Sequence, residues 1–120
     1  SKQTVLAHHL RDHLLTNREG YISLASLAAE HEISVSHLQK LFKQVYGVPI
    51  YRYIKEYRLE QAAVELVRSG KSVTEIAQQA GYDNASKFSE SFKKRYGKTP
   101  SRYRADAKKK AKQSSETKME

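Results

Sequence analysis

Two stretches of the chain place hydrogen-bonding and basic side chains at matching positions. Residues 36–53 read SHLQKLFKQVYGVPIYRY and residues 86–103 read SKFSESFKKRYGKTPSRY, with identity at seven of eighteen aligned positions. In the first stretch, Gln39 could hydrogen-bond adenine, and Lys40 could bond guanine or a phosphate oxygen. In the second, Glu90 could accept a hydrogen bond from cytosine. These residue types could form hydrogen bonds with the bases of a nucleic acid.

The formal charge of the chain follows the same two stretches. The whole chain carries +9, from 22 basic and 13 acidic residues. Residues 36–60 hold five basic against two acidic side chains, and residues 84–112 hold eleven against two. The segments around them are each slightly acidic. Such a distribution is typical of a surface that binds a polyphosphate, and the other interpretation is a basic surface without such a partner.

The composition argues against several other classes of protein. The chain has no cysteine, which excludes disulfides, thiol nucleophiles and cysteine zinc sites, and fits a reducing cytoplasm. It has no apolar run long enough to cross a membrane, and no signal-peptide pattern. His9 and His13 are four residues apart, but no suitable third ligand accompanies them, so we expect no metal, no cofactor and no enzyme activity. Because Ser1 is not a methionine, we expect a chain that was processed or cut from a longer one.

The apolar spacing predicts an all-α fold of about seven helices. Leu6, Leu10 and Leu14 recur every four residues and predict a helix over residues 3–16, which ends within residues 17–20. Further helices are predicted over residues 24–31, 36–46, 49–69, 73–80 and 84–96, and a short one near Pro100. After Arg104 the apolar pattern stops, which predicts a basic, disordered tail. The chain is predicted to consist of a first helical subdomain over residues 1–48 and a central linker helix over residues 49–69. A second helical subdomain follows over residues 70–104, and the basic tail covers residues 105–120.

The repeat extends over two successive helices in each copy. Residues 23–33 (SLASLAAEHEI) match residues 72–82 (SVTEIAQQAGY) with a shift of 49. Each copy therefore predicts a short helix, a turn and a longer helix, which is the helix-turn-helix unit. Ala28 and Ala77 supply the small residue where the two helices cross, and Gly81 tolerates the positive φ of the turn. Glu32 stands in the corresponding turn of the first copy, where we expect a strain of about 1 kcal/mol.

The predicted helix over residues 49–69 lies between the two units. At 1.5 Å per residue it is about 30 Å long, and successive major-groove faces of DNA lie about 34–36 Å apart. A rigid helix of this length could hold two recognition helices in neighbouring major grooves. The two copies differ on their exposed faces, so the predicted DNA target is not palindromic.

Four sequence blocks carry a resemblance to a known family. They are SLASLA, SHLQKLFKQVYG, YIKEYRLEQAAVEL and SVTEIAQQAGYDNASKFSESFKKRYGKTPSRYR. On these blocks, residues 5–104 resemble the DNA-binding domain of the AraC/XylS family of bacterial transcription regulators. The resemblance implies seven helices, two helix-turn-helix units joined by a central helix, and a cytoplasmic, nucleoid-associated protein that binds double-stranded promoter DNA. It also implies RNA polymerase contact in activators and, in many members, a separate N-terminal ligand-binding or dimerisation domain that these residues do not include.

The candidate DNA contacts fall on the exposed faces of the two recognition helices and just beyond them. By resemblance, Ser36, Gln39 and Lys40 occupy positions where members of the family usually read bases. The expected base-reading residues are Ser36, His37, Gln39, Lys40, Asn84, Ser86, Lys87 and Glu90. The expected phosphate contacts are Lys43, Lys93, Lys94, Arg95, Lys98, Thr99, Arg102 and Arg104. Glu90 has a second interpretation, an ion pair with Lys94 one helical turn away.

Several other functions would explain part of the charge and helix pattern. The alternative is sequence-neutral nucleic-acid binding by an architectural or RNA-binding protein, which needs the charge but not two capped recognition helices. Lys108 to Lys112 would add sequence-neutral affinity in either case. Related domains occur in DNA-repair methyl acceptors, but that chemistry needs cysteine thiolates, which the chain lacks. A membrane-surface helix ranks lowest, because a core accounts for the apolar faces.

Overall fold

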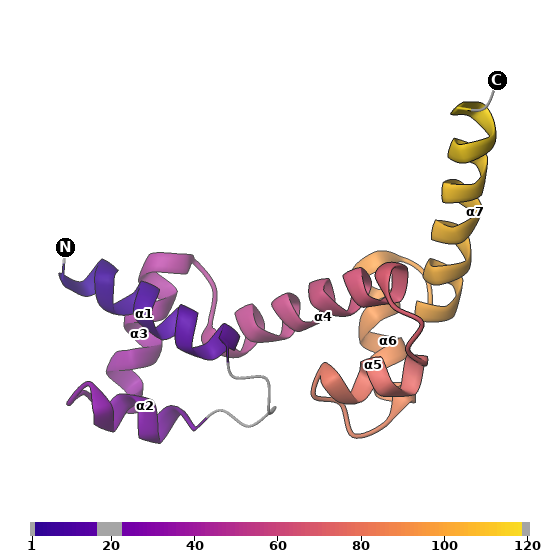
Figure 1. Cartoon of the computed structure of the whole chain (residues 1–120). Coiled ribbons are helices and arrows are strands. Elements are labelled where there is room, and N and C mark those ends of the chain that lie inside the picture. The colour runs from indigo at the N-terminus through magenta and orange to yellow at the C-terminus, as the bar shows by residue number, and fades with distance from the viewer. Residues whose placement is uncertain (1, 17–22, 119–120) are drawn as a thin grey trace. The chain divides into compact units, whose positions relative to one another are not determined.

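Seven helices make up the secondary structure of the described residues, as expected from the apolar spacing. The computed structural model describes residues 2–16 and 23–118, without the side chains of residues 13–16 and 115–118. The predicted end of the first helix within residues 17–20 lies outside the described residues. The helices are α1 (Lys2–Thr16), α2 (Leu24–Glu30), α3 (Val35–Tyr46), α4 (Ile50–Arg68), α5 (Val73–Gln79), α6 (Ala85–Tyr96) and α7 (Pro100–Lys118) (Figure 1).

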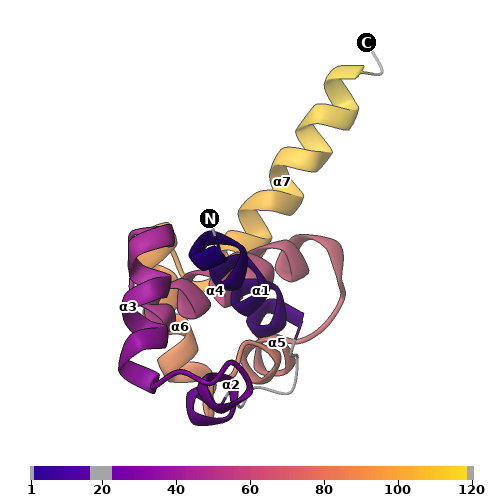
Figure 2. The same cartoon turned by 90° about the vertical axis from the view of Figure 1, so that its left-hand side faces the viewer.

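The chain divides into two compact units, and helix α4 contributes to both. The division falls between Tyr57 and Arg58, inside α4. In the first unit, α3 packs against both α1 and α2 (Figures 1 and 2). In the second unit, α6 packs against both α5 and α7. Each unit thus contains one helix-turn-helix pair, α2 with α3 or α5 with α6.

The helix-turn-helix elements begin at side-chain caps. The Ser23 hydroxyl accepts a hydrogen bond from the Ser26 amide at 3.1 Å, and Ser34 does the same for α3. Ser72 caps α5, since its hydroxyl accepts a hydrogen bond from the amide of Glu75 at 3.1 Å. Each cap satisfies an amide that the first helical turn leaves without a partner. The starts of these short helices are therefore encoded locally.

Each unit has its own hydrophobic core beneath its recognition helix. In the first unit the core contains Leu10, Leu38 and Phe42, all fully buried, and in the second it contains Phe88 and Phe92. Ala28 and Ala77 are 2% and 1% exposed and lie in these cores, which fits the small residue predicted at the helix crossing. The apolar face of each recognition helix is therefore fixed inward.

Three aromatic rings repeat almost unchanged in the two units. In the first unit, the ring of Phe42 lies 4.6 Å from that of Tyr46 and 5.3 Å from that of Tyr53. The corresponding distances from Phe92 to Tyr96 and to Tyr103 are also 4.6 and 5.3 Å. Each set joins a recognition helix to the helix that follows it. Phe92 belongs to the core of the second unit, and Tyr96 and Tyr103 are partly buried against it.

The turn between the paired helices has the same backbone in both units. Glu32 has φ 55° and Gly81 has φ 87°, both in the left-handed region. The residue after each turn returns a hydrogen bond to the buried alanine, from the Ile33 amide to Ala28 at 2.9 Å and from Tyr82 to Ala77 at 3.0 Å. Glu32 therefore adopts a conformation that costs an L-residue roughly 1 kcal/mol, as the sequence predicted.

The prediction of a disordered tail after residue 104 is wrong for the described residues. Helix α7 continues without a break to Lys118. The segment contains alanine and lysine, which are good helix formers, and has no glycine or proline. Its first turns pack on the second unit, so its later turns extend an existing helix and avoid the cost of nucleation.

We expect Glu32→Gly to leave the melting temperature unchanged or to raise it, because glycine adopts φ 55° without strain. Gly81→Ala is the matched contrast. It should lower the melting temperature, because its Cβ would lie 2.8 Å from Nη1 of Arg58 at a positive φ. Thermal unfolding followed by circular dichroism measures both. A melting temperature several degrees lower in Glu32→Gly would contradict the role given to this turn.

Candidate nucleic-acid interface

Helix α3 presents a polar and basic face opposite its buried residues. Its core residues Leu38, Leu41 and Phe42 are at most 2% exposed. The five residues predicted to contact DNA on this helix are all exposed: Ser36, His37, Gln39, Lys40 and Lys43. They span the first three turns of the helix, where hydrogen-bonding side chains can reach base edges in a major groove. The structure thus brings the first predicted set together on one surface.

Helix α6 repeats this arrangement with different side chains. Ser86, Lys87 and Glu90 are exposed, whereas Phe88 and Phe92 are fully buried. The predicted base reader Asn84 is also exposed, but it is the N-cap of α6, and its Oδ1 accepts a hydrogen bond from the Lys87 amide at 2.8 Å. Its side-chain oxygen is therefore engaged with the helix. Its amide N–H groups are not used by this cap and can donate to a base.

The ion pair considered for Glu90 does not form. Among the described side chains, neither Glu90 nor Lys94 forms an ion pair, although the two are one turn apart. Glu90 is exposed on the same face as Ser86 and Lys87. The interpretation that removed Glu90 from the interface is wrong, and its carboxylate is available as an acceptor.

The predicted phosphate contacts separate into two groups. Lys43, Lys93 and Lys94 are exposed and form no ion pair among the described side chains. The others already have partners within the second unit. The Arg95 guanidinium lies 3.9 Å from the Glu60 carboxylate and 4.9 Å from the centre of the Tyr96 ring.

The carboxylate of Asp106 binds two side chains that were predicted to contact phosphate. Lys98 Nζ lies 2.7 Å from one oxygen of its carboxylate, and Arg102 Nε lies 3.3 Å from the other. The hydrogen bond from Lys98, together with the nearby charges, lowers the pKa of Asp106. Thr99 directly precedes α7, and its hydroxyl accepts a hydrogen bond from the Arg102 amide at 3.3 Å. These residues form a small ionic network at the start of α7.

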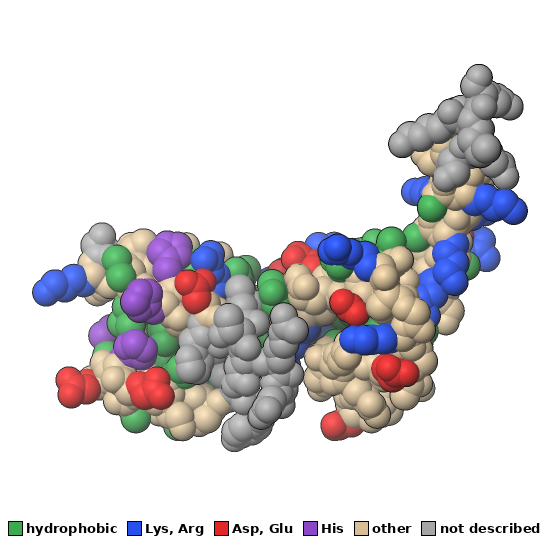
Figure 3. Space-filling view, in the orientation of Figure 1, with side chains coloured by type: hydrophobic (Ala, Val, Ile, Leu, Met, Phe, Trp, Pro, Cys, Tyr) green, Lys and Arg blue, Asp and Glu red, His purple; other side chains and the backbone are tan. Residues whose placement is uncertain are grey.

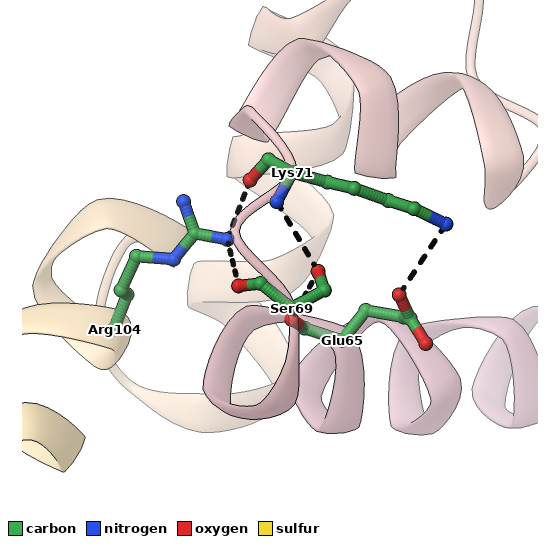
Figure 4. Close-up of polar contacts among 4 residues, drawn as sticks. All are labelled: Glu65, Ser69, Lys71 and Arg104. Carbon is green, nitrogen blue, oxygen red and sulfur yellow. Dashed lines mark hydrogen bonds and ion pairs between the residues drawn. The ribbon is translucent and has the colours of Figure 1, made fainter.

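Arg104 has a structural role, which corrects its prediction as a phosphate contact. Its Nε donates to the carbonyl of Leu66 at 2.9 Å. Its Nη2 donates to the carbonyls of Lys71 at 2.6 Å and Ser69 at 3.4 Å (Figure 4). These carbonyls lie at the C-terminal end of α4 and just after it, where helices leave acceptors unsatisfied. A cation at this end is also favoured by the helix dipole. The guanidinium thus joins α7 to the end of α4.

Tyr46 and Tyr96 are partly buried, unlike the exposed residues predicted to contact DNA on α3 and α6. Burial raises the pKa of Tyr46 and, in the second unit, of Tyr96. Both rings pack against cores, and neither is exposed. Their contribution is therefore to hold the recognition helices.

Arg52 is a cation that the sequence-based assignment missed. Its Nε lies 3.2 Å from the Glu56 carboxylate, and its side chain is 67% exposed. Arg52 aligns with Arg102 in the repeated stretches, so the repeat itself was the signal that could have identified it.

Metal binding finds no support in the described part of the chain. It contains no group of three histidine, cysteine or acidic side chains that could hold a metal ion. His9 is exposed, and the side chain of His13 lies outside the described residues. A histidine spacing of four on one helix is by itself too little for a metal site.

We expect Arg104→Met to lower the unfolding free energy by about 1–3 kcal/mol, because the carbonyls at the end of α4 lose charged donors. Arg102→Gln is the control, since Arg102 is 73% exposed and should change stability little. Urea unfolding of both variants measures the difference. Equal stability of Arg104→Met and the unaltered protein would contradict the structural role of Arg104.

A family model described as a helix-turn-helix domain matches residues 27–106. The transcriptional regulator Rob of Salmonella typhimurium is 38% identical over 99 residues, which cover 79% of this chain and 34% of Rob. The HTH-type transcriptional activator AarP of Providencia stuartii is 36% identical over 90 residues, which cover 75% of this chain and 64% of AarP. The chain thus spans about a third of the length of Rob.

A solved structure agrees with these sequence matches. It is a transcriptional regulator from Chromobacterium violaceum, described as having an AraC-type DNA-binding domain. It superposes with a TM-score of 0.73 at 27% identity, and the match covers 88% of this chain and 92% of that one. The matched family model includes both recognition helices and the whole of α4. The chain therefore belongs to the AraC-type helix-turn-helix family.

Proposed function

We propose that this chain binds double-stranded DNA sequence-specifically and regulates transcription in a bacterium. The observation that carries the proposal is the pair of recognition helices, each with a buried apolar face and an exposed face of hydrogen-bonding and basic side chains. An α-helix with its side chains fits the major groove of B-DNA, where all four base pairs can be distinguished. The names of the relatives, a transcriptional regulator and a transcriptional activator, support the same process.

The two helices would enter successive major grooves of one site. Helix α4 has 19 residues, about 28 Å at the usual rise, and begins in one unit and ends in the other. One turn of DNA is about 34–36 Å, so one molecule could read two half-sites without a symmetric partner. The exposed side chains of α3 and α6 differ, with Gln39 and Lys40 in the first and Lys87 and Glu90 in the second. The site is therefore expected to be non-palindromic.

The expected partners beyond DNA follow from the family. Contact with RNA polymerase would accompany activation. An N-terminal ligand-binding or dimerisation domain would lie outside these residues, as the partial coverage of Rob suggests. Within the described residues, no helix is long and apolar enough to span a membrane. We place the protein at the nucleoid in the bacterial cytoplasm, without a catalytic role or a cofactor.

Sequence-neutral nucleic-acid binding is the alternative function. The exposed lysines of α7 support it, because phosphate attraction requires no base contact. It leaves unexplained why two capped helices expose Gln, Ser and Glu side chains on their free faces. The sequence-specific function accounts for these residues and for the charge together.

Selection of bound sequences from a random DNA pool tests the proposed function. We expect an enriched asymmetric site with two half-sites about one helical turn apart. Competition with unselected DNA should then give an affinity ratio of about 10³ or more. A pool without enrichment, bound with the same affinity as the competitor, would favour the sequence-neutral alternative.

We expect Lys40→Ala to relax selectivity at one base position in one half-site, at a cost of about 1–3 kcal/mol for the preferred base. Lys43→Ala is the matched control on the same helix. As a phosphate contact, Lys43 should weaken all sequences equally and reduce the salt slope by about one. Binding measured on single-base variants of the selected site separates the two effects. A uniform loss for Lys40→Ala would reassign it to the phosphate backbone.

A further inference from the structure

The two units share an arginine–carboxylate pair at the same place in the repeat. Arg52 is the third residue of α4 and pairs with Glu56, four residues later. Arg102 is the third residue of α7 and pairs with Asp106, again four residues later. Both arginines follow the glycine that ends the recognition helix by five residues. The pairs are thus equivalent features of two units that differ at most other surface positions.

Helix stability alone explains these pairs poorly. A cation in the first turn of a helix opposes the helix dipole, and a pair with the acid on the C-terminal side is the weaker orientation. The arginine side chains remain 67% and 73% exposed, so solvent screens each interaction. A contribution to ligand binding is the better explanation for keeping the same pair in both units.

The second pair has an additional member. Asp106 also accepts a hydrogen bond from Lys98 at 2.7 Å, so each of its two oxygens holds one cation. A phosphate group would engage Lys98 and Arg102 in a similar way, through separate oxygens. Both of these residues were assigned to phosphate contacts from the sequence. On the free protein, Asp106 thus holds the same two cations that were expected to contact phosphate.

We propose that Glu56 and Asp106 are built-in competitors of DNA phosphate, which restrain Arg52, Arg102 and Lys98 and so limit sequence-neutral affinity. The inference rests on the proposed DNA-binding function. A phosphate must displace or share each carboxylate, so fewer counterions are released when the protein binds. Because sequence-neutral binding is almost entirely electrostatic, the restraint weakens it more than it weakens binding to the specific site. The carboxylates thereby increase the ratio between specific and non-specific affinity.

The surrounding charge makes such a restraint useful. Beyond Asp106, the side chains of α7 that the structure describes include four exposed lysines, at positions 108, 109, 110 and 112, and no acid. Lys and Arg side chains gather along this helix (Figure 3). The second unit would therefore attract any polyanion strongly. Asp106 is the acid of α7 that holds cations next to this lysine segment, since Lys98 and Arg102 both contact its carboxylate.

The test measures binding of Asp106→Asn and Glu56→Gln to random-sequence duplex DNA and to the selected site, over a range of salt concentrations. We expect each variant to bind random DNA about threefold more tightly, with a salt slope steeper by about one. The ratio of specific to non-specific affinity should fall. Glu30→Gln is the matched control, since it removes one exposed acid of α2 that forms no ion pair among the described side chains.

A double-variant cycle assigns the effect to the proposed pairs. In a protein with Lys98→Gln and Arg102→Gln, Asp106→Asn should no longer change affinity. Unchanged affinity and slope in both single variants would overturn the proposal, and so would weaker binding, which would make the carboxylates positioning groups. Circular dichroism checks that each variant folds, and the two units provide independent variants. Absence of DNA binding by the unaltered protein would instead reject the proposed function itself.

Discussion

Burial of one face of each recognition helix is the constraint on which the rest of the structure depends. Phe42 and Phe92 are completely buried, and each contacts two tyrosines, one on its own helix and one on the next. Because a helix side chain can face only one direction, anchoring these rings also determines which residues face outward. The polar faces of α3 and α6 are thus a consequence of aromatic packing.

The turn and the caps make this packing possible within a short chain. A left-handed residue reverses the chain between the paired helices, and a buried alanine lets them approach closely. The first unit accepts Glu32 in that conformation, which shows that its local strain is smaller than the stabilisation from the core. Arg104 completes the second unit by bonding carbonyls at the end of α4. With these contacts, each half holds its own recognition helix.

Charge on this protein is organised as well as abundant. Some cations are exposed without an acidic partner among the described side chains, such as Lys43 and Lys93, whereas others are bonded to carboxylates or to backbone carbonyls. An exposed cation and a bonded one contribute differently to a polyanion complex, because only the first releases its counterion freely. Sequence counts treat them alike. Equivalent arginine–acid pairs occur in both units, so the same cation of each unit is bonded to a carboxylate.

The sequence by itself determined the helices, the repeat and the family. The apolar spacing, the serine and asparagine caps and the glycines are local signals, so the boundaries of α2 to α6 were predicted to within a residue or two. Which face of each recognition helix is free also followed from this spacing. Only the tertiary structure decided the partners of the long polar side chains: Arg104 on backbone carbonyls, Lys98 and Arg102 on Asp106, and Glu90 without Lys94. Such contacts depend on which residues lie close together in the folded chain and on which rotamer each side chain adopts. Residue type and sequence spacing specify neither. The length of α7 was likewise a tertiary result, because a segment without an apolar pattern stayed helical as the continuation of turns that the core already held.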